Sequence, residues 1–173
     1  MITDIAYLES LPKETLIELL KMFAKTWLIT DGVYFQAIEE RLGVDEAVKI
    51  DIRMWERITL YQARKLKELL GLDERGPMAI ARAQNYLISS LLDGFDIEFY
   101  ENAPEKVVFA CTRCSVQEAR VRQGRGEFPC KPVGLIYYEK LIEALDPDVK
   151  LQCLACPPDP HPDDYWCKWE LTM

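Results

Sequence analysis

The chain has 173 residues, 49% of them apolar and 29% charged, and a formal net charge of −8. This length and composition favour one ordered domain with a hydrophobic core and exclude a disordered chain. The negative charge would repel a phosphate backbone, and no apolar run approaches about 18 residues, so we expect neither a nucleic-acid partner nor a membrane span. The first residues, MITDIAYLESLPKE, are acidic where a signal peptide is basic, so we expect a cytoplasmic protein.

Three helices are predicted in the first half of the chain. Apolar residues recur three or four positions apart over residues 12–43, which predicts one long helix with a bend at Gly32. The same spacing over residues 45–70, followed by a glycine, predicts a second helix. A proline suited to a first helical turn and a later glycine predict a third helix over residues 77–94.

The second half changes to the alternating pattern of strands. DIEFYENAPEKVVFACT predicts a hairpin that turns at Asn102 and Pro104. Helices are predicted again in SVQEARVRQG and KPVGLIYYEKLIEAL, and DVKLQCLAC with YWCKWELTM predicts a second hairpin. We therefore expect a single α+β domain, in which N-terminal helices accompany a small sheet made of two antiparallel hairpins. Residues 1–94 would be its helical part, and residues 95–173 its sheet and cysteine-rich part.

Four cysteines in the C-terminal part are candidate metal ligands. Cys153 and Cys156 lie near the end of one predicted strand, Cys167 near the start of its partner, and Cys130 at the start of a predicted helix. Strand pairing would bring Cys167 beside the CxxC pair, and Cys130 would complete the four sulfurs that tetrahedral zinc needs. Because cytoplasmic thiols stay reduced, we expect a metal here before disulfides, and zinc fits the spacing better than an iron–sulfur cluster.

Two other interpretations of this group stay open. A buried cysteine can be chemically inert, although several inert cysteines rarely converge by chance. His161, the only histidine in the chain, could replace one thiolate ligand. It stands between two prolines in a loop, where a solvated or turn-capping histidine is the more frequent case.

The segment FPCKPVGLIYYEKLIEALDPDVKLQCLACPPDPHPDDYWCKWEL resembles the end of the 4-vinyl reductase, or hydrocarbon-binding, domain. In zinc-binding, phenol-sensing members of that group, the ligands are a cysteine, then an acidic residue and a cysteine three apart, then a last cysteine. The resemblance implies zinc ligation by Cys130, Cys153, Cys156 and Cys167, with Cys153 in the place of the carboxylate. A site of four thiolates is closed, which argues against catalysis at the metal.

Most of the chain, including WLITDGVYFQAIEERLGVDEAV, also resembles an uncharacterised bacterial and archaeal family related to L-2-amino-thiazoline-4-carboxylate hydrolase-like proteins. This resemblance implies the mixed fold of 4-vinyl reductase domains, haem-NO-binding domains and vesicle-tethering subunits. It also implies a homodimer. It does not fix the function, because one fold serves many activities.

The second CxxC pair, Cys111 and Cys114, lies where a strand passes into a helix. A helix N-terminus lowers the pKa of a thiol. Three interpretations stay open: ligands of a second metal, a redox or nucleophilic pair, or structural residues. The helix-first order of this chain differs from the thioredoxin-like context in which a CxxC pair is usually redox-active.

Basic residues between positions 113 and 131 could anchor a small anionic ligand. Arg120 and Arg125 are the candidates, since guanidinium groups bind carboxylates in a fork, although such a run is more often a solvated face. Asp31 lies close to Trp27 and Tyr34 in an otherwise apolar stretch. These three residues could line a pocket, or Asp31 could lie on the exposed side of its helix.

The sequence shows no catalytic constellation, so catalytic residues stay unassigned. We expect a zinc-stapled protein that binds an apolar or small anionic organic ligand in a cavity under its helices. One alternative is a hydrolase of a small cyclic amino-acid derivative, with Cys111 or Cys114 as nucleophile. The other is a structural interaction subunit, which would expose an apolar helix face.

Overall fold

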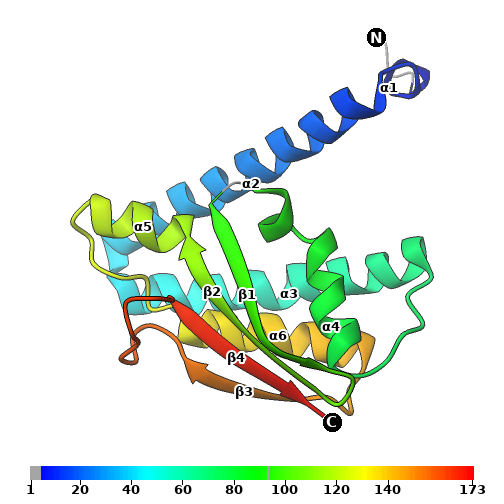
Figure 1. Cartoon of the computed structure of the whole chain (residues 1–173). Coiled ribbons are helices and arrows are strands. Elements are labelled where there is room, and N and C mark those ends of the chain that lie inside the picture. Colours follow the sequence, from blue (N-terminus) through cyan, green and yellow to red (C-terminus); the bar gives the residue numbers. More distant parts are fainter. Residues whose placement is uncertain (1–4, 93) are drawn as a thin grey trace.

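Two long helices form the N-terminal half of the protein, as the apolar spacing predicts. The computed structural model describes residues 5–92 and 94–173, in which a short α1 (Ala6–Glu9) precedes α2 (Lys13–Leu42) and α3 (Val44–Leu70) (Figure 1). Gly43 separates the long helices with a φ of +87°, a value that other residues rarely adopt, and the chain turns sharply there. α1 and the first half of α2 extend beyond the other elements in Figure 1.

The third helix is shorter than the predicted range of 77–94. α4 covers Pro77–Ala83 and is followed by two 3-10 turns, η1 (Gln84–Tyr86) and η2 (Ile88–Leu91). Leu87 has an extended backbone, with φ −99° and ψ 171°, so helical geometry is interrupted there. The hydroxyl of Ser90 donates a 3.0 Å hydrogen bond to the Leu87 carbonyl, and such local bonds compete with a helix. The prediction of one helix to residue 94 is therefore wrong.

The two predicted hairpins join into one antiparallel sheet. β1 (Phe95–Ala103) pairs with β2 (Lys106–Cys114), and β3 (Lys150–Ala155) pairs with β4 (Cys167–Thr172). β2 and β4 also pair, so the strand order is β1-β2-β4-β3 and β4 lies inside the sheet. The protein is thus of the α+β class, as predicted.

One face of this sheet carries the hydrophobic core. Phe109 of β2 lies directly opposite Trp169 of β4, so their side chains share a face. α6 (Lys131–Leu145) covers this face, and the Tyr138 ring lies 5.6 Å from the Phe109 ring and 4.9 Å from the Trp169 ring. The approach is close because α6 presents Gly134 to the indole: a Cβ there would lie 2.8 Å from the Trp169 side chain.

The remaining helices attach to this core. α3 packs against α6, where the rings of Trp55 and Tyr137 lie 5.7 Å apart. α5 (Ser115–Arg122) follows β2 directly and lies beside the C-terminal half of α2 (Figure 1). Within the part of the chain that the structure describes, no helix is long and apolar enough to cross a membrane.

Candidate metal centre

Cysteines from three strands gather at one end of the core face. Cys111 lies directly opposite Cys167 in the β2–β4 pairing, and Cys153 lies opposite Trp169 in the β3–β4 pairing. Cys167 and Trp169 are two positions apart on β4 and share a face, so all three cysteines lie on the side that α6 covers. Directly opposite residues have α-carbons about 4.5–5.5 Å apart, which places Cys111 and Cys167 in contact range.

A bulge in β2 adds Cys114 to the same face. Cys111 and Cys114 are three positions apart, a spacing that would send them to opposite faces of a regular strand. Cys111 pairs with Ile97, however, and Cys114 with Phe95, because the register shifts between Asp96 and Ile97. The extra residue in β2 turns Cys114 back to the face of Cys111. The Cys111 thiol donates a 3.0 Å hydrogen bond to the Arg113 carbonyl, and its sulfur lies close enough to that of Cys114 for each to shift the pKa of the other.

Cys130 and Cys156 reach the same place from the start of α6 and from the end of β3. Cys130 immediately precedes α6, and Cys156 follows β3 and is fully buried. The N–H of Lys131 donates a 2.8 Å hydrogen bond to the Pro157 carbonyl, and the Lys131 ammonium pairs with Asp159 at 2.5 Å. These contacts hold the loop after β3 against the start of α6.

The six residues form what we call the cysteine cluster. Five of the sulfurs lie close enough to shift one another's pKa, in the order Cys114, Cys111, Cys167, Cys156, Cys130. Cys153 stands beside this series and is coupled electrostatically to two of its members, Cys167 and Cys130. All six are free thiols. The structure therefore brings the four predicted metal ligands together, and it joins the second CxxC pair to them through Cys167.

The pKa is raised for some of these thiols and lowered for others. Bonds to neighbouring sulfurs, and burial, raise the pKa of Cys111 and of Cys156. The bond with Cys111 and the backbone N–H groups at the start of α5 lower the pKa of Cys114, although burial opposes this. Bonds with Cys111 and Cys156 lower the pKa of Cys167. Cys114 and Cys167 are thus the two positions in this series where a thiolate is favoured.

The sulfurs do not form a ready-made metal site. Over residues 5–92 and 94–173, no group of three or more histidine, cysteine, aspartate or glutamate side chains could hold a metal ion as arranged. The sulfurs on one tetrahedral zinc ion are about 3.8 Å apart, given a Zn–S distance of about 2.3 Å. Strand register already fixes the backbone positions, so metal binding would require rotation of side chains and loss of the thiol protons.

His161 has partners other than the cysteines. Its Nδ1 lies 2.9 Å from the Pro162 carbonyl, its Nε2 lies 3.4 Å from the Glu127 carboxylate, and its ring lies 5.6 Å from that of Trp166. Burial disfavours the imidazolium, but the Pro162 carbonyl and Glu127 outweigh this and raise the pKa of His161. The His161 side chain is 12% exposed and contacts Pro162 and Glu127.

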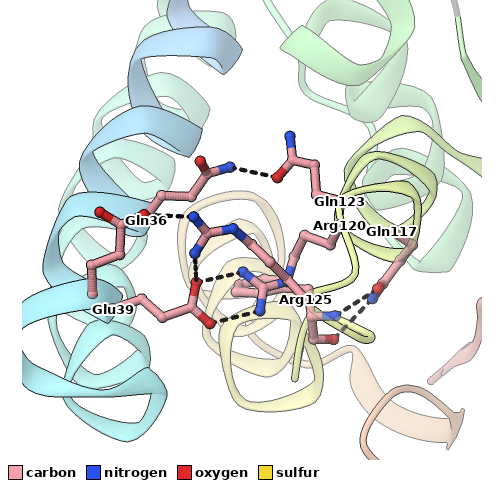
Figure 2. A network of polar contacts seen from close by, with 8 residues as sticks. Gln36, Glu39, Gln117, Arg120, Gln123 and Arg125 are labelled. Carbon is pink, nitrogen blue, oxygen red and sulfur yellow. Dashed lines mark hydrogen bonds and ion pairs between the residues drawn. The ribbon is translucent and has the colours of Figure 1, made fainter.

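The two arginines considered as ligand anchors are bound within the chain. Figure 2 shows Arg120 and Arg125 converging on Glu39 of α2. Arg120 is buried and makes two hydrogen bonds to the Glu39 carboxylate, at 2.9 and 2.8 Å. Arg125 pairs with Glu39 at 3.2 Å and with Glu40 at 2.5 Å. Hydrogen bonding from Arg120, opposed by burial, lowers the pKa of Glu39. These arginines therefore connect α5 and the loop after it to α2.

Of the other predicted ligand residues, Trp27 lies between α2 and α3 and Tyr34 lies on the surface. The Trp27 ring packs edge-on against that of Trp55 at 5.2 Å, while Tyr34 is 68% exposed. Burial raises the pKa of Asp31 to about 6. Burial and the charge of Asp31 raise the pKa of Asp51 on α3 to about 7. Asp51 is a titratable partner of Asp31 that the sequence analysis did not identify.

A hollow of about 240 Å³ lies at a different place, beside α4 and the C-terminal end of α6. Arg82 and Glu74 form an ion pair of 2.8 Å at this hollow. Its lining consists of Leu72, Glu74, Ala79, Arg82, Ala83, Tyr86 and Leu145. A mainly apolar wall with a few polar groups is the usual composition of a small-molecule site.

Comparison with known proteins identifies one family. The family of unknown function DUF6125 matches residues 9–173, and the chain belongs to it. No curated protein and no solved structure matches the chain. The resemblances to 4-vinyl reductase domains and to L-2-amino-thiazoline-4-carboxylate hydrolase-like proteins stay predictions.

Proposed function

We propose that this DUF6125 protein is a cytoplasmic, zinc-stapled protein that binds a small organic ligand. Zinc would be held by Cys130, Cys153, Cys156 and Cys167. The observation that carries this proposal is the proximity of Cys156 to both Cys130 and Cys167, three residues that come from a loop, a helix start and a strand. Sulfurs from three separate elements converge beside the fully buried Cys156, so side-chain rotation alone could bring them onto one metal ion.

The charge around the cluster also supports a metal. Four thiolates around one zinc ion carry a net charge of −2, which buried surroundings would disfavour without nearby positive groups. The Lys131 ammonium interacts electrostatically with Cys153 and Cys156. Cys130 and Cys114 lie at the N-termini of α6 and α5, where the helix dipole is positive. The free state of the thiols fits a reducing compartment such as the cytoplasm.

The metal would act as a staple of the fold. β4 pairs with both β2 and β3, and Cys167 is its first residue. A zinc ion bound to Cys130 and Cys167 would fix β4 to the start of α6, the helix that covers the core face. The binding free energy of such an ion contributes directly to folding.

The direct test is the metal content of the purified protein. We expect zinc in the wild type, and loss of zinc with severe destabilisation in Cys156→Ser. Ala155→Ser is the matched control, because it adds a hydroxyl group to the neighbouring buried position and keeps every thiol. Wild-type protein that is stable and free of metal after expression in zinc-supplied cells would exclude the zinc staple.

The ligand-binding part of the proposal is supported by the hollow beside α4, whose volume of about 240 Å³ is just below the range of about 300–1,000 Å³ usual for ligand pockets and suits a fragment-sized molecule. Arg82 is 58% exposed and could pair with an anionic group on the ligand. A fragment screen by NMR tests this part: we expect shifts around Ala83 and Tyr86 that disappear in Ala83→Trp, which fills the hollow. The contacts of Cys114 with Cys111 and backbone N–H groups suit metal ligation, and we place hydrolysis second.

A second candidate function is assembly through α2. Its exposed apolar side chains include Leu20, Met22, Phe23 and Ile29. We propose a second copy of the chain as the partner that covers them. Glu18 pairs with Lys21 within this helix at 2.9 Å, while Glu14 and Lys25 are eleven positions apart, so two antiparallel copies would place Glu14 of one near Lys25 of the other. Light scattering should report a dimer, and Phe23→Glu should produce a monomer, while Tyr61→Glu on exposed α3 surface should not.

A further inference from the structure

The zinc staple leaves two cysteines of the cluster without a role. The Cys111 sulfur lies close to that of Cys114, and Cys111 is directly opposite Cys167 in the β2–β4 pairing. They share a face only because β2 contains a bulge between them. Bulges re-aim side chains, and this one directs Cys114 toward the sulfurs of Cys111 and Cys167.

The geometry of this pair suits a metal ion better than a disulfide. Cys111 and Cys114 pair with Ile97 and Phe95, which are two positions apart on β1. Two strand residues span about 6.6–6.8 Å, which is at the upper end of the range of about 4.4–6.8 Å usual for the α-carbons of a disulfide and above its most frequent value of about 5.5–6 Å. Two thiolates on one zinc ion tolerate the larger separation, because the metal lies between the sulfurs.

We propose that the cysteine cluster binds two zinc ions, the second held by Cys111, Cys114 and Cys167, and that the Cys167 sulfur bridges both ions. This inference rests on the proposed zinc staple and extends it. Cys167 lies directly opposite Cys111 in the β2–β4 pairing and its sulfur is also a neighbour of Cys156, so it lies between the two groups of ligands. A thiolate has enough lone pairs to bind two metal ions at once.

The two ions would differ in coordination. The staple ion would have four cysteine ligands and be closed, while the second would have three and keep one position for water or another exchangeable ligand. Each thiol that binds releases its proton, so six thiolates and two zinc ions give a net charge of −2. Each ion would also have one ligand at a helix N-terminus, Cys130 for the first and Cys114 for the second.

Metal stoichiometry tests the second site and separates its failure from failure of the staple. Elemental analysis of the full-length wild type should give two zinc ions per chain, and Cys111→Ser/Cys114→Ser should give one. One ion in both proteins would overturn the second site and leave the staple intact; no ion in either would overturn both. Because the wild-type value alone decides between one ion and two, the test survives if the double variant fails to fold.

Cobalt substitution tests the bridge. We expect the electron paramagnetic resonance signal of high-spin Co²⁺ to rise with the first equivalent and to fall with the second, since two cobalt ions that share a sulfur couple magnetically. The Cys111→Ser/Cys114→Ser variant should show the rise only, and the single variant Cys114→Ser should show a weakened second phase. A wild-type signal that doubles with the second equivalent would mean two separate sites and overturn the bridging role of Cys167.

Discussion

Two buried aspartates in this protein have opposite protonation behaviour. Asp146, directly after α6, is completely buried, and hydrogen bonds from Arg75 and from the N–H of Gly76 lower its pKa to about 2. Asp51, on α3, is 7% exposed, and burial raises its pKa to about 7. The two side chains are of the same type and similarly buried, and yet one is charged at neutral pH and the other is close to its midpoint.

The hydrogen-bond donors account for the difference. Asp146 accepts bonds of 2.7 Å from the Arg75 guanidinium and 2.8 Å from the Gly76 N–H. Asp51 interacts with the Trp55 side chain and with a second carboxylate, Asp31. Burial disfavours charge in both cases, but it is the largest cause of the shift at Asp51, whereas the donors around Asp146 outweigh it. The cysteine cluster follows the same rule, since its pKa values diverge according to which sulfur receives hydrogen bonds.

The largest effect on stability is expected at Glu39, whose carboxylate pairs with both Arg120 and Arg125. Glu39→Gln would leave the Arg120 charge buried without a counter-ion, so we expect a loss of about 3–5 kcal/mol in the free energy of unfolding at pH 7. Urea denaturation measures it. Glu40→Gln is the control, because Glu40 also pairs with Arg125 but is 61% exposed, and it should cost less than about 1 kcal/mol. Equal losses in the two variants would contradict the assignment of Glu39 as the buried counter-ion.

Removing the charge of Asp146 should have the next largest effect. Asp146→Asn should lower the free energy of unfolding by about 2–3 kcal/mol at pH 7, because buried donors lose a charged acceptor. A lowered pKa stabilises the folded state above the ordinary value near pH 4, and this contribution is lost as the pH falls toward 2. The difference between wild type and variant should therefore disappear near pH 2.

Asp148 provides the matched control for this measurement. It also pairs with Arg75, at 2.8 Å, but is 70% exposed. Asp148→Asn should cost less than about 1 kcal/mol at any pH. A difference between wild type and Asp146→Asn that persists unchanged at pH 2 would show that the amide disturbs packing and that the charge is not responsible.

Asp51 should respond in the opposite direction. Its raised pKa means that the folded protein keeps a proton that the unfolded chain has already lost, so stability falls as pH rises from about 4 through about 7. Asp51→Asn removes this dependence and keeps an oxygen that can accept a bond from Trp55. We expect the variant to be about 2 kcal/mol more stable than wild type at pH 8, with no gain at pH 4. Thermal denaturation at both pH values measures the two differences, and an equal gain at both would refute the titration of Asp51.

The smallest expected effect is the coupling between the two carboxylates. Asp31→Asn removes a like charge, so the pKa of Asp51 should fall by less than about one unit, since burial is the larger cause of its shift. Carbon-13 NMR of the Asp51 carboxyl group follows the titration. Asp45→Asn changes an exposed carboxylate on the same helix and should leave the Asp51 value in place. An identical pKa in wild type and Asp31→Asn would show that the two groups do not interact.

Periodicity was sufficient to predict most of the fold. The long helices and both hairpins follow from apolar spacing, because burying one face of each element dominates their stability. The meeting of Cys130, Cys153, Cys156 and Cys167 followed from the same pattern, since strand pairing and a helix start fix their positions. The shortened α4 could not be predicted this way, because Leu87 continues the apolar spacing while its backbone is extended.

The bulge in β2 and the ion pairs between distant parts of the chain could not be predicted from the sequence. A bulge inserts one residue into a strand and leaves the composition unchanged, so nothing in ACTRCS shows that Cys111 and Cys114 share a face. Glu39 and Arg120 are far apart in the chain, and each alone has the pattern of a solvated helix surface. Asp51 carried a usable signal: it lies one turn before Trp55, on the apolar side of its helix.

The position of β4 in the sheet has a consequence for biosynthesis. β4 is the last of the four strands to leave the ribosome, and it pairs with both β2 and β3. At about 5–20 residues per second, the interval between completion of β2 at Cys114 and completion of β4 at Thr172 is roughly 3–12 s. Throughout that time the KVVFAC segment of β2 has an unpaired edge, which is a template for pairing with other nascent chains. Overexpression should therefore favour inclusion bodies seeded by this strand, and slower synthesis at low temperature with a chaperone present should raise the yield of native protein.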